Sequence, residues 1–90
     1  MELKLNKKYD LGGIETDTIN LDFDKLTGRA LVKLENEYKK ENKGVVFIVN
    51  DAGFNAKVAA YCAGVKEDDI LDLAGKDFTA VTQEVMLFLN

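Results

Sequence analysis

The sequence contains few side chains that could do chemistry. It has no histidine, so the commonest general base and metal ligand is missing. Its single cysteine, Cys62, has no neighbouring basic residue that would lower the pKa of the thiol, which favours a buried structural cysteine over a nucleophile. The glycine residues match no phosphate-binding fingerprint. From these side chains we expect a protein that is not an enzyme and that holds no cofactor.

Carboxylates are the remaining candidates. One acidic segment contains four of them: Glu67, Asp68, Asp69 and Asp72. They could bind a hard cation, but the segment lacks the central glycine and the final glutamate of a calcium-binding loop. An acidic first turn of a helix, which suits the helix dipole, is the favoured interpretation. Asp22 and Asp24 would point the same way along a strand, yet the sequence supplies no cleft around them. We expect no catalytic residue and no metal site.

The composition is typical of one small globular domain, which we expect to cover residues 1–90. Lys and Arg number 12 against 16 Asp and Glu, so the net charge is -4. This balance argues against binding nucleic acid or an anionic membrane, because phosphate contacts need clustered basic residues. The longest apolar run, VVFIV, is far shorter than the ~20 residues of a membrane span. The start MELKLNKKYD has no signal-peptide core, and a single cysteine suits a reducing compartment, so we expect a soluble cytoplasmic protein.

The N-terminal part of the chain alternates between apolar and polar residues, as strands do. Alternation is clear in ELKLNKKYDL and again in TDTINLDFD, and Gly12 and Gly13 between them can adopt the positive φ angles of a hairpin turn. A hairpin with one apolar face is only marginally stable alone, so it must pack on other elements. Gly28 would let the first turn of the following helix lie close to the hairpin.

The rest of the chain has the spacing of helices. Thr27 or Asp24 can cap a helix over 27–42. The apolar stripe of this helix consists of Leu26, Ala30, Leu31, Leu34 and Tyr38. A second helix follows Asp51 and ends at Gly64, EDDILDL forms a short acidic turn of helix, and a last amphipathic helix runs over 76–89.

These elements predict an α+β fold in which an N-terminal β-hairpin packs on a bundle of about four short helices. VVFIV, at 45–49, is too short for a helix and is compatible with a third short strand. The residues expected in the core are Leu21, Phe23, Leu31, Leu34, Val58, Ile70 and Val81.

One segment resembles a helix-turn-helix pattern. In AYCAGVKEDDI, residues 60–70, an alanine and a glycine at the right spacing would let two helices cross tightly. The second helix, however, would carry four carboxylates against Lys66 alone, and these charges would repel the DNA backbone. We interpret the motif as a helix corner and keep a small helix-turn-helix-like transcriptional regulator as an alternative.

Two longer blocks follow one another in a recognisable order. The first is LDFDKLTGRALVKLENEY, residues 21–38, in which an acidic and apolar strand meets leucine-threonine-glycine-arginine and a helix. The second is AKVAAYCAGVKEDDILDLAGKDFTAVTQEVMLFL, residues 56–89, with an alanine-rich helix, a glycine, an acidic turn, a lysine-aspartate-phenylalanine step and a valine-rich final helix. Together with the hairpin, these blocks resemble the small tail assembly chaperones of contractile-tailed, Mu-like phages and prophages over nearly the whole chain.

The resemblance implies a non-enzymatic role. Chaperones of this family bind the long, aggregation-prone tape measure protein and keep it soluble in the bacterial host cytoplasm until the tail tube polymerises around it. The resemblance also implies absence from the mature virion. We keep a minor structural virion protein as the other alternative. The family often makes a longer product by ribosomal frameshifting, and Leu87, Phe88 and Leu89 permit codons on which such a slip can occur. A frameshifted longer form of the chain, and further copies of it in a homo-oligomer, are additional candidate partners.

Five apolar residues are the candidates for partner binding, because the short elements contain more apolar side chains than they can bury. They are Phe54, Tyr61, Val85, Met86 and Phe88. Each one taken singly suits the core. As a group, we expect some of them to form an exposed patch that binds the client protein or another copy of the chain.

Overall fold

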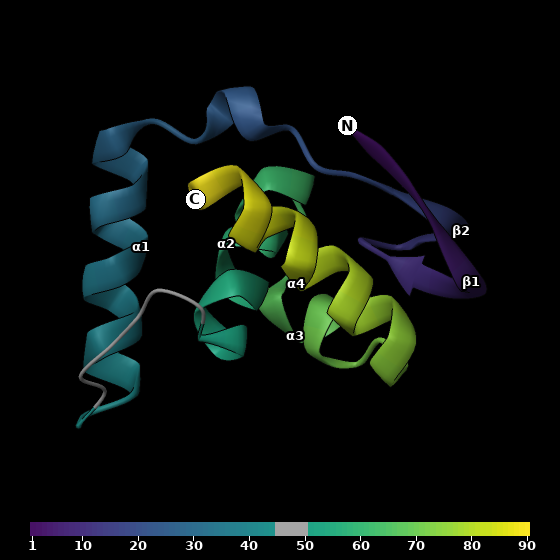
Figure 1. Ribbon diagram of the computed structural model, residues 1–90. Coiled ribbons are helices and arrows are strands. Elements are labelled where there is room, and N and C mark those ends of the chain that lie inside the picture. Colours follow the sequence, from purple (N-terminus) through teal and green to yellow (C-terminus); the bar gives the residue numbers. More distant parts are fainter. Residues whose placement is uncertain (45–50) are drawn as a thin grey trace.

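The computed structural model describes residues 1–44 and 51–90. Over these residues the chain forms a two-stranded antiparallel sheet, one short 3-10 helix (η1) and four α-helices, in the order β1, β2, η1, α1, α2, α3 and α4 (Figure 1). The predicted α+β class, with an N-terminal hairpin and four helices, is confirmed. The third strand considered for 45–49 lies outside the described residues. None of the helices in the described part of the chain is long and apolar enough to cross a bilayer.

The hairpin consists of β1 (Glu2–Leu11) and β2 (Ile14–Asn20). Gly12 and Gly13 form the connection between them, as predicted. Their φ angles are 64° and 88°, and the tight turn that matches the twist of two paired strands requires positive values at both positions. Any residue with a side chain would strain the turn at either position.

A bulge interrupts the pairing in the middle of β1. Lys4 pairs with Thr18 and Tyr9 pairs with Thr16, so more residues lie between the two pairs on β1 than on β2. The extra residues leave the ladder, and their backbone groups can bond outside the sheet. The backbone N–H of Asn6, which lies in this bulge, donates to a side chain of α4.

The four described α-helices have several of their ends at local signals that the sequence contains. They are α1 (Gly28–Glu41), α2 (Ala52–Ala63), α3 (Glu67–Leu71) and α4 (Gly75–Leu89). Thr27 Oγ1 accepts a hydrogen bond of 3.1 Å from the N–H of Ala30, and Asp51 caps α2 in the same way. α2 ends at Gly64, which adopts the left-handed conformation with a φ of 70°.

The core is built around α2. One cluster of buried side chains draws on both strands and all four α-helices of the described chain, and its members on α2 include the small Ala56, Ala59 and Ala60, which let neighbouring helices approach closely. Five of the residues predicted for the core are buried: Leu21, Leu34, Val58, Ile70 and Val81. Phe23 and Leu31 are only partly buried and pack against the cluster.

The hairpin and α1 lie on opposite sides of the unit formed by α2, α3 and α4 (Figure 1). β1 contacts α4 and β2 contacts α2, while η1 (Phe23–Lys25) carries the chain across to the side of α1. The prediction that Gly28 lets α1 approach the hairpin is wrong, because a Cβ added there would meet no atom within 4 Å. The partner of the apolar hairpin face is the C-terminal half of the chain.

Candidate interaction surfaces

A buried carboxylate joins the hairpin to α4. Asp77, in the first turn of α4, is 2% exposed. Its Oδ1 accepts hydrogen bonds from the backbone N–H and the side-chain amide of Asn6, at 2.8 and 3.0 Å, and its Oδ2 accepts one from the Tyr9 hydroxyl at 2.6 Å. Burial alone would raise the pKa of Asp77, but these donors favour the ionised form and hold the pKa below its usual value. Asp77 therefore fixes the bulge of β1 against α4.

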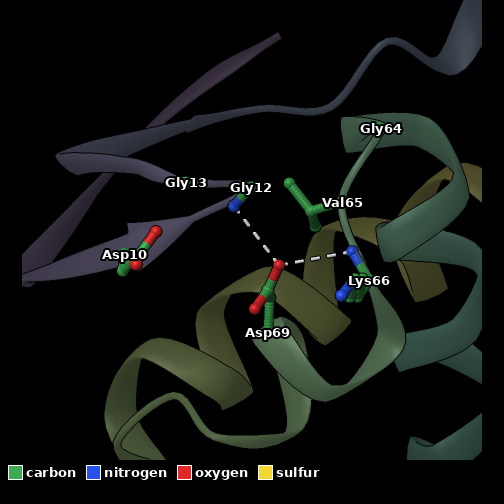
Figure 2. Close-up of a pocket in the computed structure, with 7 residues that line it drawn as sticks. All are labelled: Asp10, Gly12, Gly13, Gly64, Val65, Lys66 and Asp69. Carbon is green, nitrogen blue, oxygen red and sulfur yellow. Dashed lines mark hydrogen bonds between the residues drawn. The ribbon is translucent and has the colours of Figure 1, made fainter.

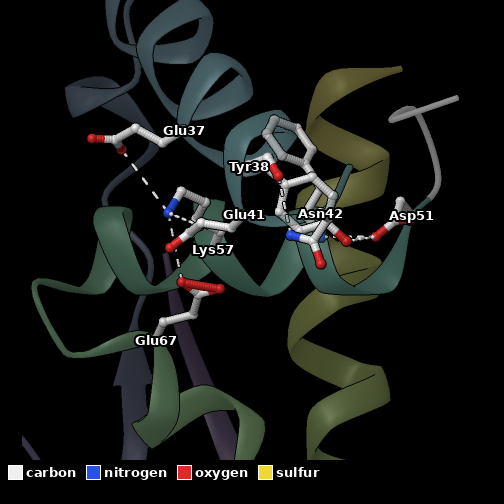
Figure 3. Close-up of polar contacts among 8 residues, drawn as sticks. Glu37, Tyr38, Glu41, Asn42, Asp51, Lys57 and Glu67 are labelled. Carbon is white, nitrogen blue, oxygen red and sulfur yellow. Dashed lines mark hydrogen bonds and ion pairs between the residues drawn. The ribbon is translucent and has the colours of Figure 1, made fainter. Parts of the chain in front are cut away.

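A second carboxylate joins α1 to the start of α2 (Figure 3). Oδ1 of Asp51 accepts a hydrogen bond of 2.5 Å from the Tyr38 hydroxyl and another of 3.0 Å from the N–H of Phe54. The bond to Asp51, together with burial, raises the pKa of Tyr38 to about 12. The close approach depends on Gly53, where a Cβ would lie 2.6 Å from the Tyr38 hydroxyl oxygen.

Lys57 of α2 is surrounded by glutamates of neighbouring helices (Figure 3). Its Nζ lies 3.1 Å from Glu41 and 3.9 Å from Glu37, both on α1, and 3.6 Å from Glu67 of α3. Burial would lower the pKa of the ammonium group, but the three carboxylates raise it by more. Because the lysine side chain is only 12% exposed, solvent screens these pairs less than ordinary surface pairs.

The acidic segment around α3 also has structural contacts. Oδ2 of Asp69 accepts hydrogen bonds of 3.3 Å from the backbone N–H groups of Gly12 and Lys66, so one carboxylate caps α3 and holds the hairpin turn (Figure 2). The hollow at this junction is lined by Asp10, Gly12, Gly13, Gly64, Val65, Lys66 and Asp69. Among residues 1–44 and 51–90, no group of three or more histidine, cysteine or carboxylate side chains is arranged to hold a metal ion.

The other reactive side chains noted in the sequence have roles in the fold. Oδ1 of Asp22 accepts a hydrogen bond of 3.2 Å from the N–H of Asp24 and so caps η1. Cys62 is buried in the core, and this burial raises the pKa of its thiol. A raised thiol pKa leaves little thiolate at neutral pH, which suits a structural cysteine.

Apolar side chains gather at the C-terminal end of α4, beside η1. The rings of Phe23 and Phe88 are stacked, with 4.4 Å between their centroids and an interplanar angle of 6°. Phe88 is nevertheless 48% exposed, and the adjacent Leu87 is 61% exposed. We call Phe23, Leu87 and Phe88 the η1 surface. An aromatic ring such as that of Phe88, which remains half open to solvent while already stacked on a partner, suits protein binding.

The five predicted partner-binding residues divide between core and surface. Phe54 and Val85 are buried in the cluster around α2, so these two candidates are core residues and do not belong to an exposed patch. Met86 is half-buried and lines a separate groove between α2 and α4. Tyr61 and Phe88 are exposed, and each lies against a residue of η1: Phe88 stacks on Phe23, and the centroid of the Tyr61 ring lies 5.5 Å from the ammonium group of Lys25.

Tyr61 belongs to a second surface, which we call the cationic groove. It lies between α1 and α2, and its lining residues are Thr27, Arg29, Ala30, Lys33, Leu34, Glu37 and Tyr61. Sequence reasoning missed this groove, because its two walls are about thirty residues apart along the chain. It also missed Leu87 as a surface residue. The run MLFL contained a signal, since four consecutive apolar residues of a helix cannot all face one side.

Comparisons with models of protein families, with curated proteins and with solved structures return no match to this chain.

Proposed function

We propose that the protein is a non-enzymatic tail assembly chaperone, which binds the tape measure protein of a phage or prophage and keeps it soluble during tail assembly. The η1 surface is the observation that carries the proposal, because it places two stacked phenylalanines and an exposed leucine together at one end of α4. All three residues fall within the sequence blocks that resemble this chaperone family: Phe23 in the first block, Leu87 and Phe88 in the second.

The chemistry of the η1 surface suits a helical client. An amphipathic helix binds a partner by laying its apolar face against an apolar surface, and aromatic anchors supply large contact area with few rotatable bonds. The net charge of -4 would keep the resulting complex in solution. We place the protein in the bacterial host cytoplasm, where the tape measure protein must stay soluble until the tail tube polymerises around it. We expect it to be absent from the mature virion.

The test is co-expression with the tape measure protein encoded in the same genome. We expect the tape measure protein in the soluble fraction with the wild-type chain and in the pellet with Phe88→Asp, because a charge at the η1 surface opposes apolar contact. Ile14→Asp is the matched control: it adds the same charge at an apolar side chain that is 68% exposed, on the hairpin, and should leave solubilisation unchanged.

Circular dichroism of each variant separates loss of binding from loss of folding. Failure of the wild-type chain to raise the soluble fraction would contradict the proposed function. If Phe88→Asp is folded and still solubilises the client, the function stands and the η1 surface is the wrong site. Equal loss with Ile14→Asp and Phe88→Asp would likewise argue against a specific site on α4.

The corner between α2 and α3 does not favour the transcriptional regulator. α3 covers only Glu67–Leu71 and begins with three carboxylates, whereas a recognition helix must approach the phosphates of DNA. We propose that the protein binds no nucleic acid, so a mobility-shift assay at low salt should show no retardation. Mass spectrometry of purified phage particles tests the other alternative, a minor structural virion protein. We expect no peptide of this chain in the particles.

A further inference from the structure

The cationic groove carries positive charge that no other group neutralises in the described part of the chain. Arg29 and Lys33 line it one helical turn apart on α1, and neither forms an ion pair with a described residue. Glu37 lies at the end of the lining but is already engaged by Lys57. Residues 25–34 contain no carboxylate, although the whole chain has a net charge of -4. The groove therefore suits a negatively charged occupant.

The groove also has room for an apolar side chain. Its volume is about 360 Å³, and the buried Leu34 and the ring of Tyr61 are among its lining residues. Arg29 is the one arginine of the sequence, and its planar guanidinium can bind a carboxylate through two parallel hydrogen bonds. An occupant that fits must combine carboxylates with an apolar side chain on one face.

α3 presents this combination on another part of the surface. Asp68 and Asp72 are exposed, lie four residues apart, and form no ion pair with a described residue. Leu71, three residues after Asp68 and therefore on the same side of the helix, is 47% exposed. Residues 67–73 contain no basic residue. The buried members of this turn, such as Ile70, face the core, whereas about half of the Leu71 side chain is left uncovered by the described residues.

We infer that copies of this chain associate head to tail, with α3 of one copy seated in the cationic groove of the next. The spacings agree, because four residues of helix rise about 6 Å both from Arg29 to Lys33 and from Asp68 to Asp72. Leu71 then enters the groove beside Tyr61. Whole copies repel one another at a net charge of -4, so the contact depends on this local complementarity. The inference does not rest on the chaperone function, because the η1 surface is not used.

The contact has a defined symmetry. Each copy inserts its α3 into the groove of one neighbour and binds the α3 of another neighbour in its own groove. The interface is therefore heterologous, and it builds open chains of copies, or a ring if the rotation between copies closes. Association should therefore continue beyond a dimer as the concentration rises. It should weaken at high salt, since ions screen exposed charges.

Sedimentation velocity over a concentration series tests the inference with two matched variants. The groove variant carries Arg29→Glu and Lys33→Glu, and the α3 variant carries Asp68→Lys and Asp72→Lys. Each alone should associate at least about tenfold more weakly than the wild type, since two ion pairs become two repulsions. Mixed together, the two variants should associate again as alternating copies, because the unchanged α3 of the groove variant meets the unchanged groove of the α3 variant and the two reversed surfaces also carry opposite charges. The chain with all four substitutions pairs opposite charges again and should recover association.

Circular dichroism checks the fold of each variant, and Leu71→Ser replaces the α3 variant if the charge reversals disturb α3; it should also weaken association. A wild-type chain that stays monomeric over the whole series overturns the inference. So does association that persists in both variants, which would place the interface elsewhere. The inference requires that association is lost in the groove variant and in the α3 variant and is recovered in the chain with all four substitutions. If the groove variant loses only tape measure binding, the groove holds the client and not a second copy.

Discussion

Replacement of Asp77 by asparagine should weaken the junction between the hairpin and α4. The carboxylate accepts three hydrogen bonds, two from Asn6 and one from the Tyr9 hydroxyl. An asparagine keeps one acceptor oxygen but turns the other position into a donor, which then faces the Tyr9 hydroxyl. That hydroxyl already accepts a hydrogen bond of 3.2 Å from the N–H of Ala74. In the variant its own hydrogen has no acceptor within the junction.

The expected cost follows from these contacts. A hydrogen bond to a charged group contributes about 1.5–3 kcal/mol, and the bonds from Asn6 also weaken when the acceptor loses its charge. We therefore expect Asp77→Asn to lower the free energy of unfolding by about 2–3 kcal/mol at neutral pH. For a chain of 90 residues this corresponds to a fall in Tm of roughly 8–20 °C.

The dependence on pH distinguishes this mechanism from a simple packing defect. The pKa of Asp77 in the folded protein is lowered from its ordinary 3.8, so the unfolded state binds the proton more readily. The contribution of Asp77 to stability is thus complete above pH 3.8 and is lost as the pH falls through the lower folded value. The gap between wild type and variant should close over that acid range.

Urea unfolding followed by circular dichroism, at neutral pH and at about pH 3, measures both quantities. Asp10→Asn is the matched control on β1, because Asp10 is exposed, and it should change stability by less than about 0.5 kcal/mol. A loss as small as the control's, or a gap that stays constant as the pH falls, would refute the reasoning.

Three further changes test the packing of α1. Leu34→Ala should lower the free energy of unfolding by about 2–5 kcal/mol, against less than about 0.5 kcal/mol for the exposed Val32→Ala; equal effects would remove Leu34 from the core. Tyr38→Phe should cost about 1–2 kcal/mol at neutral pH. Because the Tyr38 pKa is raised from 10.0 to about 12, that difference should shrink as the pH rises through this interval, and a constant difference would contradict the bond to Asp51. Lys57→Met should cost about 1–2 kcal/mol, less in high salt, and a loss independent of salt would point to packing instead of charge.

Local signals in the sequence predicted most of the fold. The helices expected over 27–42 and 76–89 agree with the structure to within one residue at each end. Capping side chains and glycines act on the backbone next to them, so their effect depends little on the rest of the chain. The hairpin is similar, because the two-glycine connection and the alternation of apolar residues are both local.

The remaining features depend on contacts between distant residues. An aspartate in the first turn of a helix usually faces solvent, and only the bulge of β1 shows why Asp77 is buried. Phe54, Val85 and Phe88 have the same apolar character. Phe54 and Val85 are nevertheless buried in the core, whereas Phe88 is exposed, because the packing of the helices decides which face of each is covered. Of the candidate site, the sequence therefore identified Phe88 and Tyr61 as members of a mixed group. It could not separate them from the core residues.

Site-specific photo-crosslinking tests the central claim, binding of the tape measure protein at the η1 surface, most directly. A photoreactive phenylalanine analogue placed at position 88 keeps an aromatic ring at the stack with Phe23, and the same analogue at position 14 serves as the control on the hairpin. Irradiation during tail assembly should link position 88, and not position 14, to the tape measure protein. Crosslinks from position 88 only to other proteins, or equal crosslinking from both positions, would contradict the proposed function at this surface.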